Sequence, residues 1–255
     1  MRLINTKTLE LELFDSDDYG DRPRYAILSH RWGREEVTYK DFSNLTPLLR
    51  SKQGFKFAKI LKACETALAV YQLQYLWVDS CCIDKSSSAE LSEAINRMFE
   101  WYRRSKVCIT HLADVTHDDG ESLRKSDWFR RGWTLQELLA PDFVDLFDKD
   151  WTKLGGRASM TGVLSEITRI PADILSRGKD HDYDWRLMHS VAAKMSWASR
   201  RRTTRPEDVA YCLMGLFDVT MPLLYGEGFR AFERLKEAIV KHTNDMSILW
   251  NVDRD

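Results

Sequence analysis

A single glutamate, Glu137, is the strongest candidate for chemistry, because it lies in an otherwise apolar stretch beside aromatic and cationic side chains. The stretch runs from Asp127 to Pro141 and reads DWFRRGWTLQELLAP. Trp133 precedes Glu137 by four residues, so in a helix the two side chains share a face and could line one cleft. A lone carboxylate beside an indole and two arginines is chemically suggestive.

The same residues also fit a purely structural role. Thr134 and Glu137 have the T-x-x-E spacing of a capping box, in which each residue satisfies a backbone amide at a helix start. Trp133 and Leu138 are placed as the hydrophobic staple around that box. On spacing alone the capping interpretation is favoured, because helix starts are far commoner than active sites.

A second polar cluster follows a short apolar run, Tyr25 to Ser29, which is typical of a parallel strand covered on both faces. The cluster reads SHRWG and includes His30, Arg31 and Trp32. Open α/β sheets bind ligands at the carboxyl ends of their strands, so His30 and Arg31 could reach a ligand. Taken singly, each is better explained as a solvated loop residue.

The cysteines offer a weaker candidate. Cys81 or Cys82 could act as a thiol nucleophile with His111 as its base, but nothing in the sequence places them together. The chain has five cysteines, an odd number without metal-ligand spacing. We therefore predict reduced thiols packed in the core of a cytoplasmic protein, and no metal site.

Two further motifs are better explained by structure than by ligand binding. Arg200 to Arg202 could grip a phosphate, but a charge run at a helix start more often forms a solvated turn. Tyr225 to Gly228 is turn chemistry before a helix and lacks the pattern of a phosphate-binding glycine loop.

Composition excludes several classes of partner. The 255 residues are 44% hydrophobic and carry a net charge of −1, so nothing indicates a nucleic acid or an anionic membrane as partner. No apolar run approaches the length of a membrane span, and the first residues do not resemble a signal peptide.

Strands and helices alternate along the first part of the chain. This order predicts an α/β fold with a parallel sheet covered by helices on both faces. Right-handed crossovers would bring the strand ends at Ser29, Asp79 and Leu112 to one rim. Thr8 to Phe14 alternates leucine with polar residues, as a half-exposed strand at a sheet edge does. The predicted parallel strands are Tyr25–Ser29, Tyr75–Asp79, Val107–Leu112 and Phe143–Phe147. Three helices are predicted between them. The first is Phe55–Leu73, the second starts at a capping box formed by Ser87 and Glu90, and the third ends at Pro141.

The pattern becomes helical after Trp151. We predict a boundary near Gly155 and Gly156, with an α/β core over residues 1–155 and a helical extension over 156–255 packed on it as one structural unit. The helices expected in the extension are Ser159–Thr168, Asp184–Ala198, Pro206–Phe217 and Phe229–His242, with a last strand at Ile248–Trp250.

Four separated blocks, in this order, resemble the fungal heterokaryon-incompatibility (HET) domain. They read YAILSHRWG, YLWVDSCCIDK, WFRRGWTLQELLAP and RPEDVAYCLMGLFDVTMPLLYGEGFRAFERL. The resemblance implies a cell-death effector of fungal non-self recognition, working in the cytoplasm and coupled to a nucleotide-binding receptor module.

The first part of the chain also resembles a Toll/interleukin-1 receptor (TIR) domain, which has a flavodoxin-like parallel sheet. The features that carry the resemblance are a first strand ending in a serine-containing loop and a later tryptophan four residues before a glutamate. By this resemblance Glu137 is the catalytic residue of an NAD+ glycohydrolase that works when assembled. Ser29, His30 and Arg31 replace the first-strand loop. The loop is not a close match, and the helical extension has no TIR counterpart.

The remaining assignments follow from the same resemblance and from the chemistry of NAD+, which is a substrate here and not a cofactor. Trp133 is expected to stack on nicotinamide or shape its pocket, and one or both of Arg130 and Arg131 to face the pyrophosphate. Trp32 and Asp79 complete the predicted substrate-binding set. A helix N-terminus favours an ionised Glu137, so the capping position and the catalytic role are compatible. The alternative is a non-enzymatic signalling module that kills by recruiting partners through its surface.

Overall fold

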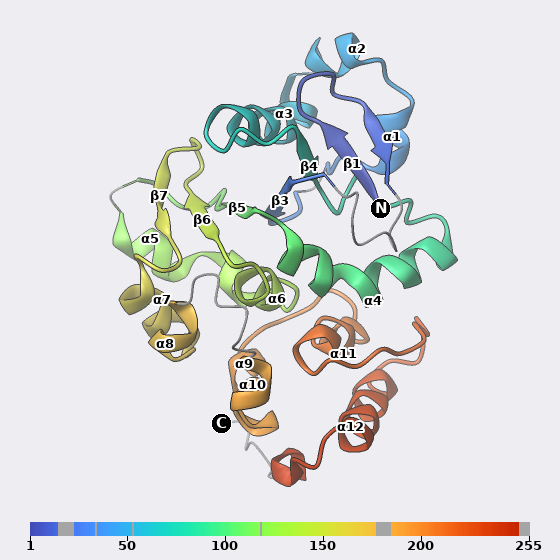
Figure 1. Cartoon of the computed structure of the whole chain (residues 1–255), viewed down its shortest axis with the longest axis vertical. Helices are drawn as coiled ribbons and strands as arrows, with labels where there is room; N and C mark the ends of the chain where they lie inside the picture. The colour runs from blue at the N-terminus through green and yellow to red at the C-terminus, as the bar shows by residue number, and fades with distance from the viewer. Residues whose placement is uncertain (15–22, 34, 53, 118, 177–184, 250–255) are drawn as a thin grey trace.

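The computed structural model describes residues 1–14, 23–33, 35–52, 54–117, 119–176 and 185–249, and its strands form one seven-stranded sheet (Figure 1). The strand order is β2-β1-β4-β3-β5-β6-β7. The strands are β1 (Arg2–Asn5), β2 (Leu11–Leu13), β3 (Tyr25–His30), β4 (Tyr75–Trp77), β5 (Val107–His111), β6 (Val144–Phe147) and β7 (Lys153–Gly156).

The centre of the sheet is parallel, as predicted. β3 pairs in parallel with β4 on one side and with β5 on the other, and β5 pairs in parallel with β6. The first parallel strand in the chain, β3, therefore lies between the second and the third. The connection after β3 leads to β4 on one side, and the connection after β4 crosses back to β5 on the other side of β3, which creates a topological switch point between β3 and β5. The predicted α/β sheet is confirmed, whereas its TIR-like detail stays a prediction.

Antiparallel strands close both edges of the sheet. β1 pairs antiparallel with β2 and β4, and β7 pairs antiparallel with β6. β2 lies at the edge, where the alternation of Thr8 to Phe14 predicts a strand, although only Leu11–Leu13 is extended. β1 and β7 were not predicted. Both are four residues long, and β7 ends in two glycines, so neither has a recognisable strand pattern.

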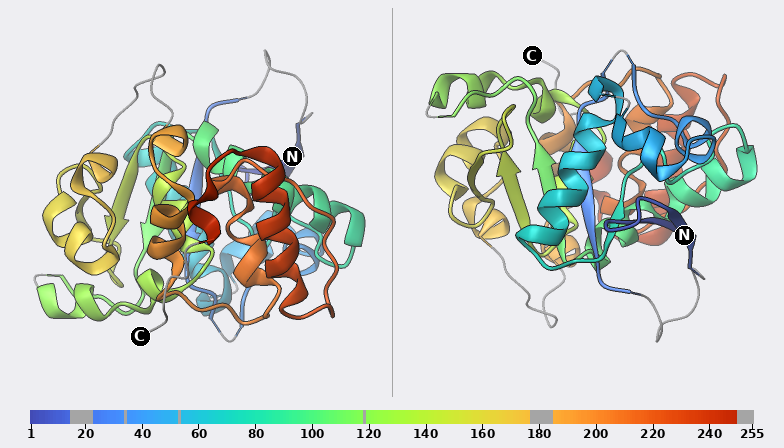
Figure 2. Two further views of the ribbon diagram at one scale, coloured as in Figure 1. Left: turned by 90° about the horizontal axis from the view of Figure 1, so that it is seen from below. Right: turned by 90° about the horizontal axis from the view of Figure 1, so that it is seen from above.

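Helices cover both faces of the sheet (Figure 2). α3 (Gly54–Ala69) lies on one face, and α4 (Ser88–Arg104) and α6 (Thr134–Leu139) lie on the other. Half of the predicted capping box of α4 is present, since the Ser87 side chain accepts a hydrogen bond from the Glu90 amide. The Glu90 carboxylate accepts from the Asp84 amide at 2.8 Å, and not from the amide of Ser87. The remaining helices near the sheet are α1 (Tyr39–Ser43), α2 (Pro47–Lys52), α5 (Gly120–Lys125) and the 3-10 helix η1 (Asp127–Arg130).

The C-terminal helices form a further layer, in which those from residue 185 onward lie beneath α4 and α6 and those within 161–175 lie to the side of α6 (Figure 1). Gly215 marks this contact: a Cβ atom there would lie 2.2 Å from Phe99 Cβ on α4, so a side chain could not fit. These helices are α7 (Thr161–Thr168), α8 (Ala172–Leu175), α9 (Trp185–Met188), α10 (Val191–Ala198), α11 (Asp208–Tyr211), η2 (Met214–Leu216), α12 (Arg230–His242) and η3 (Met246–Leu249).

The C-terminal predictions are right in kind and wrong in detail. The helix expected over Asp184–Ala198 is divided into α9 and α10, because Ser190 caps a new start by accepting from the Ala193 amide. Its first residue, Asp184, lies outside the described residues. The strand expected at Ile248–Trp250 is wrong, since Ile248 lies in the 3-10 helix η3, and Trp250 is outside the described residues.

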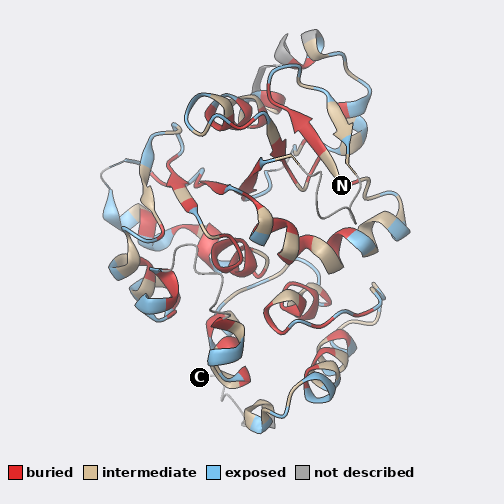
Figure 3. Cartoon of the chain, viewed as in Figure 1, coloured by how far each residue is buried: buried red, intermediate tan, exposed pale blue. Residues whose placement is uncertain are grey.

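One consequence of this layering is that α6 is enclosed. All six of its residues are buried, because the sheet covers one side and the C-terminal helices the other (Figure 3). A charged side chain on α6 therefore has to find partners inside the protein. Among the described residues, no helix combines the length and the apolar character that crossing a membrane requires.

Candidate functional site

The candidate site lies at the switch point, where the carboxyl ends of β3 and β5 meet. Ser29 and His30 end β3 and pair in register with Thr110 and His111 of β5. Successive side chains of a strand point to opposite faces, so Ser29 and His30 face different layers. Ser29 faces α6, and His30 faces α3.

The capping interpretation of Glu137 is wrong. Residue 133 is the N-cap of α6 and makes no side-chain cap bond. The Thr134 hydroxyl instead donates to the carbonyls of Trp128 and Arg131, at 2.6 and 2.9 Å. The stretch from Asp127 is also not one helix, because η1 ends at Arg130 and α6 starts at Thr134. The Glu137 side chain is therefore free to contact the sheet.

Glu137 contacts the end of β3, 108 residues away in the sequence. The Ser29 hydroxyl donates a hydrogen bond to Glu137 Oε2. The indole nitrogen of Trp128 donates to Ser29 Oγ at 2.8 Å, which leaves the hydroxyl proton for the glutamate. Tyr102, from α4, also hydrogen-bonds with the carboxyl group. Ser29, Trp128 and Tyr102 are almost fully buried, and Glu137 is 8% exposed.

These surroundings make the carboxyl group hard to ionise. Burial raises the pKa of Glu137 to about 8, and the nearby negative charge of Asp79 acts in the same direction. The hydrogen bonds from Ser29 and Tyr102 and the charge of Arg131 act in the opposite direction and do not compensate. At neutral pH the carboxyl group is mostly protonated, and a cation placed beside it would promote its ionisation.

Asp79, Trp32 and Lys85 form the outer part of the site. The Trp32 indole nitrogen donates to the two oxygens of Asp79, at 3.0 and 3.3 Å. Lys85 Nζ lies 3.7 Å from Asp79 Oδ2 and 3.5 Å from the centroid of the Trp32 ring. Because Trp32 is 39% exposed, this cluster is accessible from solvent, in contrast to Glu137.

His30 belongs to a separate group on the α3 face. Its Nε2 lies 3.3 Å from Glu36 Oε1, and Glu36 also binds Lys59 at 2.8 Å. Burial raises the pKa of Glu36, but His30 and Lys59 outweigh it and lower the pKa to about 2. The other ring nitrogen of His30, Nδ1, is buried without a hydrogen-bond partner in the described part of the chain.

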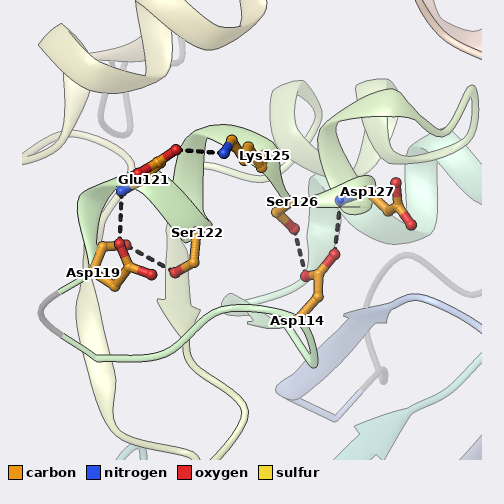
Figure 4. A pocket seen from close by; sticks show the side chains of 7 residues that line it. All are labelled: Asp114, Asp119, Glu121, Ser122, Lys125, Ser126 and Asp127. Carbon is orange, nitrogen blue, oxygen red and sulfur yellow. Dashed lines mark hydrogen bonds and ion pairs between the residues drawn. The ribbon is translucent and has the colours of Figure 1, made fainter.

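Arg31 and Arg130 both lie near an acidic surface pocket instead of Glu137. Arg31 binds Asp127 at 2.6 Å, and Arg130 lies 3.9 Å from the same carboxylate. The pocket contains four carboxylates, and Asp114 accepts from Ser126 and from the Asp127 amide (Figure 4). Its lining residues are Asp114, Asp119, Glu121, Ser122, Lys125, Ser126 and Asp127.

Trp133 contacts the C-terminal layer. Its side chain hydrogen-bonds with Asp208 at the start of α11. The neighbouring Arg201 Nη1 donates to the carbonyl of Arg131 and to Thr134 Oγ1, at 3.0 and 2.9 Å. The solvated-turn interpretation of Arg200–Arg202 is therefore wrong for Arg201, which fastens the start of α6 to the C-terminal helices.

Sequence reasoning missed three residues of the site. Trp128 is the indole that binds Ser29, although the four-residue spacing to Glu137 draws attention to Trp133. Tyr102 lies in the apolar stripe of α4, so the sequence indicates only a core residue. Lys85 lies in a polar loop, where a lysine is usually solvated. The only available signal for Trp128 was its presence in the same aromatic block.

The thiols have the properties of core residues. Cys81 and Cys82 are buried, and burial raises the pKa of Cys81 well above its usual value. His111 stacks on Trp151 with ring centroids 4.4 Å apart, and burial lowers its pKa to about 4. A buried thiol that resists ionisation is a poor nucleophile, which supports the packing interpretation.

Comparisons with known proteins connect this chain to one family. A family model described as "Heterokaryon incompatibility protein (HET)" matches residues 25–126, which include Ser29, Asp79 and Tyr102 and end before Glu137. The Vegetative incompatibility protein HET-E-1 of Podospora anserina is 43% identical over 234 residues. That match covers 87% of this chain and only 16% of the relative. No solved structure matches.

Proposed function

Since the chain belongs to the heterokaryon-incompatibility (HET) domain family, we propose that it is a cell-death effector of fungal non-self recognition that cleaves NAD+ at the nicotinamide–ribose bond. The observation that carries this proposal is the contact between Ser29 and Glu137. It brings the one carboxyl group of the enclosed α6 to the switch point of the sheet, where α/β folds bind their ligands.

The chemistry requires little machinery. Nicotinamide in NAD+ is a pyridinium, so the electron pair of the broken C1′–N bond neutralises the ring, and nicotinamide leaves without a general acid. The ribose is left with oxocarbenium character, as in glycoside hydrolysis. An ionised Glu137 would stabilise that positive charge. Water then adds at C1′ and loses a proton to solvent, giving ADP-ribose.

The raised pKa of Glu137 fits this role. A protonated carboxyl group is tolerated in a buried site while no substrate is present. When a positively charged ring binds nearby, its charge favours the carboxylate, and the Ser29 hydroxyl is already placed to donate to it. Charge would thus develop where and when the transition state requires it.

The assembly that this proposal implies has three parts: the domain itself, further copies of the domain, and a nucleotide-binding receptor module. The relative is much longer than this chain, since the match covers 16% of it. We propose a cytoplasmic site of action, with NAD+ as the substrate and with neither a nucleic acid nor a membrane as partner.

The rival function is a non-enzymatic module that kills by recruiting partners. It is supported by large apolar side chains at the surface of the C-terminal helices, notably Leu187, Met188 and Phe229, which are 84%, 65% and 71% exposed. Such side chains can form a docking surface.

The experiment that separates these functions follows nicotinamide release from NAD+ by the purified chain, free and fused to an inducible clustering module. We expect release that increases on clustering, in parallel with killing of cells that express the fusion. Killing by clustered protein that releases no nicotinamide would instead support the recruiting module.

A further inference from the structure

Trp32, Asp79 and Lys85 form an arrangement that is typical of cation recognition. The Lys85 ammonium lies 3.5 Å from the centroid of the Trp32 ring, over the face of the indole. Asp79 holds the indole N–H at 3.0 Å and therefore fixes the orientation in which the ring presents that face. Tryptophan is the best of the aromatic side chains for binding a cation on its face.

The cation that occupies the Trp32 face is Lys85 of the same chain, and its ammonium is incompletely hydrated there. Burial lowers the pKa of Lys85, so its ammonium is partly deprived of water, and the attraction of Asp79 only partly offsets that loss. An ammonium is compact and strongly hydrated. A planar, delocalised cation loses less hydration on a tryptophan face, so it could displace Lys85 and return the ammonium to solvent.

The cluster is electrostatically connected to Glu137. The charge of Asp79 contributes to the raised pKa of Glu137, so the two carboxyl groups are close enough to interact. A permanent cation beside Asp79 would offset that charge and so favour ionisation of Glu137. The site thus combines an exposed aromatic face with a carboxylate that fixes it and whose charge acts on Glu137.

We propose that Lys85 occupies the subsite that binds the cationic nicotinamide ring of NAD+, and that it competes with this ring for the face of Trp32. The identity of the ring rests on the proposed NAD+ cleavage. The competition itself follows from the geometry of the three side chains. Lys85 is accordingly a residue that sets the affinity of the subsite, without taking part in bond cleavage.

The test uses two small probes that differ mainly in charge, 1-methylnicotinamide as the cation and nicotinamide as its neutral analogue. Their dissociation constants are measured by ligand-observed NMR titration on the 255-residue chain. The variants are Lys85→Met and Lys85→Gln, which remove the charge, and Lys85→Arg, which keeps it. Lys62→Met is the matched control, because Lys62 forms an exposed ion pair with Glu65 on α3.

Both neutral variants at position 85 are expected to bind 1-methylnicotinamide roughly three- to thirtyfold more tightly than the parent, the range that a cation–π contact accounts for. Binding of nicotinamide should change less than about twofold, and Lys62→Met should resemble the parent. Lys85→Arg should bind 1-methylnicotinamide no more tightly than the parent, because a guanidinium also occupies the indole face. Adding Trp32→Leu to Lys85→Met should abolish the gain. Circular dichroism confirms that each variant is folded.

Unchanged or weaker binding of 1-methylnicotinamide by a folded Lys85→Met or Lys85→Gln variant would overturn the proposal. The readout is binding, so its outcome is distinct from that of the proposed function. A tighter cation subsite in a chain that releases no nicotinamide would leave the competition intact and defeat NAD+ cleavage. Cleavage that depends on Glu137, with no effect at Lys85, would do the reverse.

Discussion

Two buried glutamates, one at the sheet and one in the C-terminal layer, have opposite electrostatic environments. As whole residues Glu137 is 8% exposed and Glu207 is 4% exposed, but burial affects the pKa of the Glu137 carboxyl group far more than that of Glu207. The pKa of Glu137 is raised to about 8, mainly by burial. The pKa of Glu207 is lowered, because its own backbone amide and those of Gly226 and Gly228 stabilise the carboxylate.

The two carboxyl groups also differ in their hydrogen-bond donors. Glu207 Oε1 accepts the amides of Gly226 and Gly228, at 2.8 and 3.0 Å. These glycines have φ of +107° and +61°, a left-handed conformation in which glycine is not strained, and this lets both amides point at one oxygen. Among the described residues, the hydrogen bonds of the Glu137 carboxyl group are with two hydroxyl groups, those of Ser29 and Tyr102. Fixed amides make Glu207 a structural anion for the loop before α12.

The comparison shows two states of a carboxyl group inside a protein: a stabilised carboxylate that supports the fold, and a protonated group that ionises only with difficulty. Glu207 is satisfied in its charged form, which is the arrangement expected of a structural residue. Glu137 is kept protonated, because its surroundings disfavour the carboxylate. Groups with a pKa perturbed in this way concentrate at functional sites.

The largest expected effect is on stability. Because the folded pKa of Glu137 is raised, its contribution is fully present below the unfolded pKa near 4.5 and is lost as pH rises through about 8. Glu137→Gln, which cannot ionise, should therefore gain stability over the parent by up to about 4 kcal/mol at pH 9 and almost nothing at pH 4. Urea unfolding at both pH values measures the two differences.

Glu207→Gln is the matched control for that measurement, and its sign is opposite. A lowered folded pKa contributes stability that is present above the unfolded pKa and lost as pH falls. Glu207→Gln should therefore be less stable than the parent at pH 7, by a margin that shrinks in acid. The comparison breaks down if both variants change stability in the same direction at pH 8.

The next effect is on the pH dependence of the reaction. If ionised Glu137 is required, kcat/KM for NAD+ should rise from pH 6 to pH 8 by roughly fiftyfold and level off above that range. Nicotinamide release is measured in a series of buffers, with enzyme-free blanks for the alkaline breakdown of NAD+. A profile that is flat, or that falls with pH, contradicts a carboxylate with a pKa of about 8.

A smaller effect is expected from Ser29→Ala, which removes the hydrogen bond that favours the ionised form. The pKa of Glu137 should rise further, so the pH profile moves upward by about one unit and activity at pH 7 falls roughly three- to tenfold. Thr110→Val is the control, because Thr110 lies beside Ser29 in register and its hydroxyl contacts Cys108 instead. Its profile should match that of the parent.

The smallest effect is expected from the thiols. A double variant, Cys81→Ala with Cys82→Ala, should keep its rate of nicotinamide release within about threefold of the parent, because both thiols are buried in the core and take no part in the proposed reaction. The assay is run below the unfolding temperature of the variant. A folded double variant without activity would instead favour a thiol nucleophile at Cys81 or Cys82.

The parts of the fold that depend on local pattern were predictable. The apolar run from Tyr25 predicted β3 correctly, because both faces of a parallel strand are covered. Ser87 and Glu90 predicted the start of α4. The strand prediction at Ile248 was wrong, because a short apolar run fits a strand and a helix equally well, and Ile248 lies in η3.

The site itself depends on contacts that local spacing does not encode. Thr134 and Glu137 have the spacing of a capping box, yet Thr134 binds carbonyls of η1 and its loop, and Glu137 binds Ser29 across 108 residues. Tertiary partners outcompeted the local ones in both cases. For the same reason the sequence directed attention to Trp133, whereas Trp128 is the indole beside Ser29.

The central claim is that Glu137 supplies the negative charge for NAD+ cleavage, and the most direct measurement is nicotinamide release by Glu137→Gln beside Glu207→Gln. Glutamine keeps the size and most of the hydrogen bonding of glutamate and removes only the charge. We predict that clustered Glu137→Gln turns over at least about a hundredfold more slowly than the parent, while Glu207→Gln stays within about threefold. Turnover by a folded Glu137→Gln within a few-fold of the parent would contradict the claim.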